Sequence, residues 1–230
     1  MSAPTPAVLT TTEWQQACQQ RAAVYGWFSS LYARELPAAT LAAYEGGELA
    51  TLLDGLCRIG LEAPSQRLQQ AFDSLREVPQ AHLELAADFA HAFLLDAKAG
   101  ALPYASCYTG KSEEFFGEAE QRMRSFLAQS SLALQDEFKE PTDHLAIYLA
   151  VMVKLIEQAG TSAMPTTVQA LDQAAFLKDG LMDWLALFVD KCQQVGTRYD
   201  VYPALASLLL AFVQQDQAFL QDVAQGETVT

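Results

Sequence analysis

The chain has 230 residues, of which 51% are hydrophobic and 18% charged, and its 28 acidic and 14 basic side chains give a net charge of −14. This composition excludes a disordered tail protein, because it supplies enough apolar surface for one sizeable core or two small ones in close contact. The negative charge repels nucleic-acid phosphates and favours cationic partners, although it also fits a charge that only maintains solubility.

No export signal is expected in the first residues. Residues 1–12 lack a basic segment followed by an apolar one, and their Pro and Thr content predicts a disordered lead-in. The longest apolar runs, Leu145–Val153 and Leu208–Val213, are much shorter than the roughly 20 residues that cross a bilayer. We therefore expect no membrane insertion and a cytoplasmic location, with a folded domain at 13–224 and a tail at 225–230.

Apolar residues recur at three- and four-residue spacing nearly throughout, without the sustained alternation of strands. The fold class predicted is all-α, a bundle-like domain of about nine to eleven helices. The helices are expected near 12–35, 38–45, 48–59, 65–77, 80–97, 112–129, 141–159, 166–178, 181–195 and 201–224.

Two segments interrupt the helical pattern. Residues 98–111 predict a structured loop; if the chain after Pro103 is extended, Tyr104, Ser106 and Tyr108 point to one side. They then either line a binding groove or pack their rings on the core. The connector near 130–141 predicts a hinge between two helical halves, and exchange of halves there makes either a monomer or a domain-swapped homodimer an expected state.

The connector ends in the run Glu140-Pro141-Thr142-Asp143-His144. Pro141 favours a first helical turn, so we expect Glu140 near the N-cap and Asp143 near the third helical position, where an acid gains about 0.3–1 kcal/mol from the helix dipole. The helix start disfavours a protonated His144 and the two acids favour it, which leaves the direction of its pKa shift open.

The helix after this run predicts a buried, central element, because an apolar stripe covers most of it. Its members are Leu145, Leu149, Met152 and Ile156, widened by Ile147 and Val151. The polar run is then either a capped helix start with His144 packed over Tyr148, or an acidic mouth at the end of an apolar groove. Such a mouth suits a peptide with basic and apolar residues.

Other constellations give little support to catalysis or metal binding. Asp88 and His91 have a spacing used in di-iron bundles, but such a site needs two motifs of this kind, so no metal is expected. Neither a P-loop nor a GxSxG motif is present. The scattered cysteines predict reduced, mostly buried side chains rather than disulfides or a zinc site; they are Cys18, Cys57, Cys107 and Cys192.

The run at 140–144 resembles the EPxDH signature of the TorD/DmsD/NarJ family of molybdoenzyme-specific chaperones, and the resemblance is greatest to the TorD branch of that family. Other segments agree in order and spacing over roughly residues 13–224. They are Arg21–Phe28 with Leu31-Tyr32, Ala87-Asp88-Phe89 with Phe93-Leu94, Pro103–Tyr108, and Trp184 with Tyr202–Leu205.

The resemblance implies a cytoplasmic chaperone without enzymatic activity. Its partners would be the twin-arginine signal peptide and the mature apo form of a molybdenum oxidoreductase, with trimethylamine N-oxide reductase as the expected client. It would assist insertion of the molybdenum cofactor before export. No cofactor of its own is expected, although weak GTP binding occurs in some members.

The resemblance also implies the site. In the family the signature lies at or beside a hinge, which here gives Pro141 a structural role. Recognition of the signal peptide falls on Asp143 and His144, with Glu140 beside them, since carboxylates accept guanidinium groups bidentately. The predicted peptide-binding set is completed by Tyr104, Ser106, Tyr108, Asp88, Phe89 and Phe93.

Two functions of other classes stay open. One is a metal- or nucleotide-dependent helical hydrolase that uses Glu140, Asp143 and His144. The other is a general adaptor whose groove binds amphipathic helices, and which would bind a peptide equally well after its two arginines are replaced by glutamine.

Overall fold

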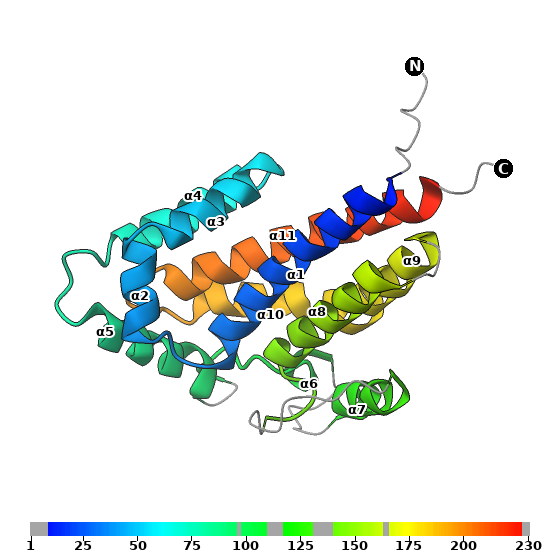
Figure 1. The fold of residues 1–230 in the computed structure, drawn as a ribbon. Helices are drawn as coiled ribbons and strands as arrows, with labels where there is room; N and C mark the ends of the chain where they lie inside the picture. Colours follow the sequence, from blue (N-terminus) through cyan, green and yellow to red (C-terminus); the bar gives the residue numbers. More distant parts are fainter. Residues whose placement is uncertain (1–8, 96–97, 110–116, 131–139, 163–165, 227–230) are drawn as a thin grey trace, which may run out of the picture. The chain divides into compact units, whose positions relative to one another are not determined.

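The computed structural model describes residues 9–95, 98–109, 117–130, 140–162 and 166–226. These residues form eleven α-helices, two π-helical segments and the turns between them, which confirms the predicted all-α class (Figure 1). The elements are α1 (Thr11–Ala33), α2 (Ala38–Glu45), α3 (Glu48–Arg58), α4 (Glu62–Asp73), α5 (Ala81–Phe89), η1 (Ala90–Leu94), α6 (Ser106–Thr109), α7 (Glu118–Ser130), α8 (Leu145–Thr161), α9 (Thr166–Phe176), η2 (Leu177–Met182), α10 (Asp183–Gln194) and α11 (Val201–Gly226).

Most predicted helices lie within a few residues of the observed ones, and three predictions are corrected. The helix expected at 80–97 divides into α5 and the wider turns of η1, and the loop expected at 98–111 contains the short helix α6. The helix expected from Pro141 begins at Leu145 instead. Helix α1 begins at Thr11, inside the predicted lead-in, while residues 1–8 and the first residues of the helix expected at 112–129 lie outside the described residues.

The chain divides into two compact units. The first unit comprises 1–30, 104–184 and 213–230, and the second comprises 31–103 and 185–212. Helices α1, α10 and α11 contribute residues to both. Helices α7 and α8, on either side of the predicted hinge, belong to the same first unit. Residues 131–139 lie outside the described residues, so the hinge near 130–141 stays a prediction.

In the first unit, α8 is the buried helix that its apolar stripe predicts. Leu145, Leu149 and Met152 have no exposed surface. Helix α1 runs beside the C-terminal part of α11, at the blue and red ends of the chain (Figure 1). The two are joined by a buried ion pair in which Nε of Arg21 lies 2.5 Å from Oδ1 of Asp216. The paired charge is tolerated because the bidentate contact satisfies both carboxylate oxygens.

The second unit is built around an aromatic cluster. Phe93 lies edge-on to Tyr32 at 5.6 Å and to Tyr202 at 5.3 Å, measured between ring centroids. Phe89 and Phe188 extend the same cluster. Rings in these edge-to-face arrangements stabilise a core beyond the area that they bury.

Among the described residues, no helix is long and apolar enough to cross a membrane.

Candidate functional site

Helix α8 begins with His144 as its N-cap. Its ring Nδ1 accepts a hydrogen bond from the main-chain N–H of Ala146 at 3.0 Å, and its carbonyl accepts from Ile147 at 2.9 Å. The N–H of His144 in turn donates to the carbonyl of Pro141 at 3.0 Å. Residues 140–144 therefore form a turn before the helix, which we name the signature turn. The predicted helix start at Pro141 is wrong because His144, not Glu140, supplies the capping group.

Burial settles the direction of the pKa shift that the sequence left open. It lowers the pKa of His144 to about 4 from its ordinary value of 6.5. The ring is therefore neutral at pH 7, and because Nδ1 accepts a hydrogen bond, its proton is on Nε2. His144 acts at this pH as a buried cap and hydrogen-bonding ring, and not as a positive charge.

A second segment, residues 104–106, lies against the signature turn; we name it the strap. Tyr104 and His144 form an antiparallel bridge, and their rings meet edge-on with centroids 4.9 Å apart. The N–H of Ala105 donates to the carbonyl of Asp143 at 3.0 Å. The strap thus pairs with the turn by main chain and side chain alike, which brings together five of the predicted site residues.

The carboxylate of Asp143 is fully buried beneath the strap. Its Oδ2 accepts the N–H of Ser106, the first residue of α6, at 2.9 Å. Its Oδ1 and the hydroxyl of Ser106 are also buried, and neither has a hydrogen-bond partner in the described part of the chain. Because buried polar atoms are normally paired, Asp143 keeps unused acceptor capacity.

Glu140 is the exposed carboxylate of the turn. Its Oε2 accepts a hydrogen bond of 2.6 Å from the hydroxyl of Tyr104. Burial and this hydrogen bond raise the pKa of Tyr104, so the hydroxyl stays protonated and acts as the donor. The turn therefore presents one carboxylate at the surface and holds another below it, each bonded to a donor of the strap.

Helix α7 contributes a buried acid that the sequence analysis missed. The hydroxyl of Thr142, in the signature turn, donates to the carbonyl of Glu120 at 3.1 Å. The Glu120 side chain is buried and pairs with Arg124, whose own side chain is largely exposed. The spacing of four residues between Glu120 and Arg124 was the available signal, since it places both on one helix face.

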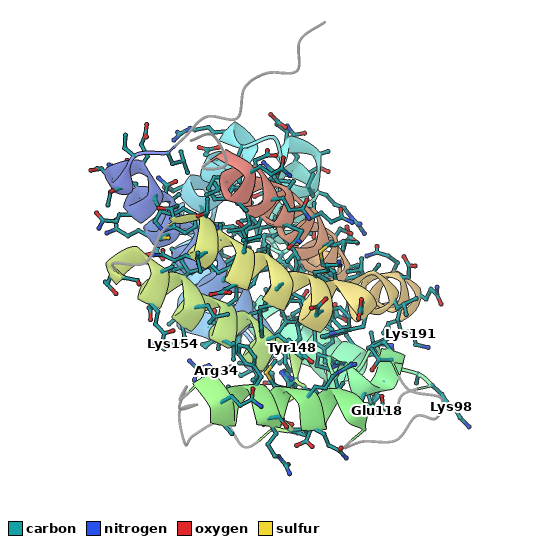
Figure 2. The ribbon with its side chains drawn as sticks, turned by 90° about the vertical axis from the view of Figure 1, so that its right-hand side faces the viewer. Arg34, Lys98, Glu118, Tyr148, Lys154 and Lys191 are labelled. Carbon is teal, nitrogen blue, oxygen red and sulfur yellow. The ribbon has the colours of Figure 1, made fainter. Side chains whose placement is uncertain are left out.

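An aromatic cluster lies next to the strap. Tyr108 stacks on Trp184 at 5.8 Å between centroids, and Trp184 also contacts Tyr148, which is labelled on α8 in Figure 2. Because residues 106–109 are helical, the prediction of an extended segment with Tyr104, Ser106 and Tyr108 on one side is wrong. Ser106 bonds to Asp143, whereas Tyr108 packs on Trp184.

The remaining predicted residues lie in the second unit. Asp88 accepts the main-chain N–H groups of Arg198 and Tyr199 on its two oxygens, each at 2.8 Å. Phe89 and Phe93 are buried members of the aromatic cluster around which the second unit is built. All three have structural contacts that account for their burial. A role for them in peptide binding stays a prediction.

The described residues offer little to a metal ion. No group of three or more His, Cys, Asp or Glu side chains suited to a metal occurs among them. In the predicted pair of Asp88 and His91, both carboxylate oxygens already accept main-chain N–H groups, and Nε2 of the histidine lies 3.1 Å from the carbonyl of Val195.

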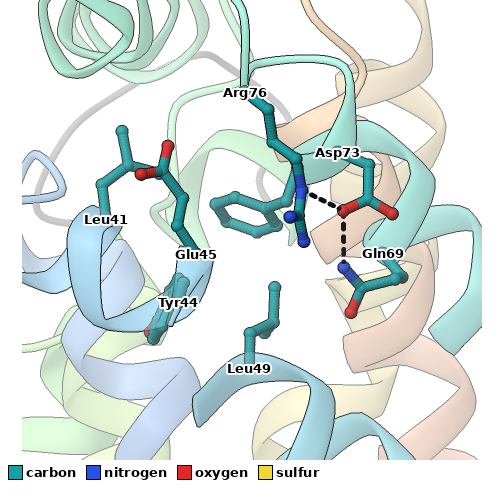
Figure 3. A pocket seen from close by; sticks show the side chains of 8 residues that line it. Leu41, Tyr44, Glu45, Leu49, Gln69, Asp73 and Arg76 are labelled. Atoms are coloured by element: carbon teal, nitrogen blue, oxygen red, sulfur yellow. Dashed lines mark hydrogen bonds and ion pairs between the residues drawn. The ribbon is translucent and has the colours of Figure 1, made fainter. Parts of the chain in front are cut away.

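A pocket in the second unit involves none of the predicted site residues (Figure 3). Its space amounts to about 220 Å³ only when the open solvent at its mouth is included. One oxygen of Asp73 accepts from both Gln69 and Arg76 at its edge. The lining residues are Leu41, Tyr44, Glu45, Leu49, Gln69, Phe72, Asp73 and Arg76. Its wall combines aromatic rings with a paired Asp and Arg.

Comparisons with known proteins show the family to which the chain belongs. Residues 58–190 match the family of the nitrate reductase delta subunit. The chain is 41% identical to the chaperone protein TorD of a Psychrobacter species over 94% of this chain and 98% of that protein. It is 40% identical to the chaperone protein TorD of Photobacterium profundum, over 88% of this chain and 94% of that protein.

A third relative, the chaperone protein TorD of Vibrio cholerae, is 36% identical over 90% of this chain and 94% of its own length. The chain therefore belongs to the TorD family of chaperone proteins, which confirms the family predicted from the sequence. As a member of a chaperone family it is not an enzyme.

Proposed function

We propose that this chaperone acts in the cytoplasm on a molybdenum oxidoreductase, with trimethylamine N-oxide reductase as its client. It binds the client's twin-arginine signal peptide and its apo form, and assists insertion of the molybdenum cofactor before export. Family membership supports the chaperone role, and the signature turn supports recognition of a cationic peptide.

The observation that carries the peptide-binding role is the pair of carboxylates in one turn. Glu140 is exposed, and Asp143 is buried three residues later with an unpartnered oxygen. Two carboxylates suit a peptide with two guanidinium groups, since each can accept a guanidinium through paired N–H donors. The net charge of −14 favours the approach of such a peptide.

The residues take different roles in this proposal. Glu140 makes the first contact because it is accessible, and Asp143, which is fully buried, provides a second acceptor. His144 holds the turn in place as the cap of α8 and adds no charge at neutral pH. The half-buried rings of Tyr104 and Tyr108 offer apolar surface next to the acids.

Calorimetric titration of the purified protein with a synthetic signal peptide tests the proposal. The peptide carries an Arg-Arg pair followed by an apolar segment, and the control peptide carries Gln-Gln instead. We expect binding that weakens with added salt, because the first contact is between exposed charges. We also expect at least about tenfold weaker binding of the control, given roughly 1.5–3 kcal/mol for each charge-assisted hydrogen bond.

The two other functions give different results in the same experiments. Equal affinity for both peptides would favour a general adaptor for amphipathic helices. Bound metal at unit stoichiometry together with phosphate release would favour a hydrolase, against the family assignment. Absence of peptide binding at both low and moderate salt would remove the signal-peptide role.

A further inference from the structure

The strap supplies one hydrogen-bond donor to each carboxylate of the signature turn. The hydroxyl of Tyr104 donates to Oε2 of Glu140 at 2.6 Å, and the N–H of Ser106 donates to Oδ2 of Asp143 at 2.9 Å. These are the two acceptor groups that the proposed function gives to the two arginines of the peptide. A guanidinium that pairs with both oxygens of either carboxylate therefore competes with the strap donor at Oε2 of Glu140 or Oδ2 of Asp143.

We propose that the strap is an internal competitor of the signal peptide. In the unbound protein it occupies Glu140 and Asp143 through Tyr104 and Ser106, and two guanidinium groups replace these donors when the peptide binds. Binding is thereby coupled to detachment of residues 104–106 from the turn. This inference rests on the proposed function and adds to it how the site is kept closed.

Burial makes detachment necessary. Asp143 has no exposed surface, so no outside group reaches its carboxylate while the strap is in place. The strap lies directly against Asp143, since Ala105 bonds to its carbonyl and Ser106 to its side chain. A peptide that uses only Glu140 would replace the hydroxyl of Tyr104 but leave the main-chain bonds of Ala105 and Ser106 to Asp143 in place, which separates the two modes experimentally.

With the strap in place, some buried polar atoms lack hydrogen-bond partners, which favours replacement of the strap by the peptide. Oδ1 of Asp143 and the hydroxyl of Ser106 are buried without partners in the described part of the chain. Burial of an unpaired polar atom is unfavourable. A guanidinium carries five N–H donors in a planar fork and can satisfy both oxygens of Asp143, which the single N–H of Ser106 does not.

This geometry gives selectivity for arginine over lysine. An ammonium group is a compact point charge without the planar fork. It therefore replaces the strap less well than a guanidinium, which can bond to both oxygens of a carboxylate. We expect a Lys-Lys peptide to bind wild-type protein more weakly than the Arg-Arg peptide. The difference in affinity between the two peptides should be smaller in variants whose strap is already loosened.

Two substitutions loosen the strap at different atoms. Tyr104→Phe removes the hydroxyl that bonds to Glu140 and keeps the ring against His144. Ser106→Pro removes the N–H that bonds to Asp143, and proline is tolerated there because Ser106 is the first residue of α6. Tyr199→Phe, a half-buried tyrosine of the second unit, is the matched control.

We expect each strap variant to bind the Arg-Arg peptide about threefold to tenfold more tightly than wild type, the gain for one released hydrogen bond. Tyr199→Phe should leave the affinity unchanged. Calorimetry gives the affinities, and thermal unfolding confirms that each variant is folded. Should Ser106→Pro fail to fold, Tyr104→Phe carries the test alone.

Hydrogen exchange on the wild-type protein gives a second, independent readout. Addition of the Arg-Arg peptide should speed exchange of the main-chain N–H groups of Ala105 and Ser106, since both lose their acceptors on Asp143. The N–H of Ala146, which is held by His144 within the turn, should stay protected.

The outcomes distinguish the strap from the proposed function. If the peptide binds wild type while the strap variants bind no better and Ala105 and Ser106 stay protected, the competitor role is wrong and peptide binding stands. Weaker binding by Tyr104→Phe would also overturn it, because the hydroxyl would then contact the peptide. If no protein binds the peptide, both ideas fail together.

Discussion

Asp88 in the second unit and Asp143 in the first are both buried carboxylates that accept main-chain N–H groups from a distant segment. They differ in how many of their oxygens accept a hydrogen bond. Both oxygens of Asp88 are bonded, to Arg198 and Tyr199, whereas Asp143 bonds to Ser106 on one oxygen and leaves the other unpartnered in the described chain.

This difference separates a structural carboxylate from a candidate recognition site. A buried acid with both oxygens paired gains little from a new donor, because a bond must be lost for each one made. A buried acid with a free oxygen gains a full hydrogen bond when a donor arrives. Equal burial and equal residue type therefore do not mean equal function, and the count of satisfied oxygens is the more informative quantity.

The largest effect is expected for Asp88→Asn. An amide has one acceptor oxygen, so one of the two N–H groups at 198–199 loses its partner and faces the new NH2 group. We expect the free energy of unfolding to fall by about 3–4 kcal/mol, the sum of a lost charge-assisted bond and an unpaired donor. Urea denaturation measures it.

The same variant tests the predicted peptide role of Asp88. Binding is to be measured at a temperature where the variant is folded. Unchanged affinity for the Arg-Arg peptide would assign Asp88 to structure alone, whereas a loss of affinity in the folded variant would return it to the binding set and weaken the contrast with Asp143.

His144 in the signature turn should lower the free energy of unfolding of the protein in acid. The pKa of His144 is lowered to about 4 in the folded protein, so below pH 6.5 the unfolded chain takes up the proton first. Stability from this group is full above pH 6.5 and declines as the pH falls from 6.5 to 4. A shift of this size corresponds to a loss of about 3 kcal/mol at pH 4.

His144→Asn is the matched variant for the acid effect. The asparagine oxygen can still cap α8 by accepting the N–H of Ala146, but it does not titrate. Urea unfolding at several pH values should show a shallower decline between pH 6.5 and 4 in the variant. Parallel curves for the two proteins would show that His144 is not the group that responds.

The π-helical segment η2 in the first unit and helix α3 in the second each contain a glycine, and the two glycines differ in the space around them. In η2 a Cβ added to Gly180 would lie 3.1 Å from Cε1 of Tyr148, whose ring is confined by Phe176 and Trp184. We expect Gly180→Ala to lower the free energy of unfolding by about 1–2 kcal/mol through overpacking. Gly55→Ala in α3, with no atom within 4 Å of the added Cβ, should instead raise it by up to about 1 kcal/mol.

Unfolding measured for both glycine variants checks this prediction. Equal changes would mean that the aromatic cluster around Tyr148 yields easily to added volume. A loss of stability in Gly180→Ala alone would show that the wide turns of η2 require a residue without a side chain at this position.

The sequence predicted the helices well because their signals are local. The spacing of Leu145, Leu149 and Met152 determines one buried face, and the observed helix has that face at its centre. The start of α8 was misplaced because Asp143, expected in the first turn of the helix, bonds to Ser106, 37 residues away, and His144 caps the helix instead. The contacts of Asp88, more than a hundred residues apart, have no local signature either.

The smallest change in stability, and the sharpest test of the comparison, is expected for Asp143→Asn. The amide oxygen can keep the N–H of Ser106, and the NH2 group takes the place of the unpartnered oxygen, so the free energy of unfolding should change by less than about 1 kcal/mol. Affinity for the Arg-Arg peptide should nevertheless fall about tenfold, because a neutral amide loses the charge-assisted bond to a guanidinium. Urea denaturation and calorimetry on one preparation measure both.

A destabilisation as large as that of Asp88→Asn would show that Asp143 is a structural carboxylate of the same kind, whereas lost binding with retained stability would assign its free oxygen to the client.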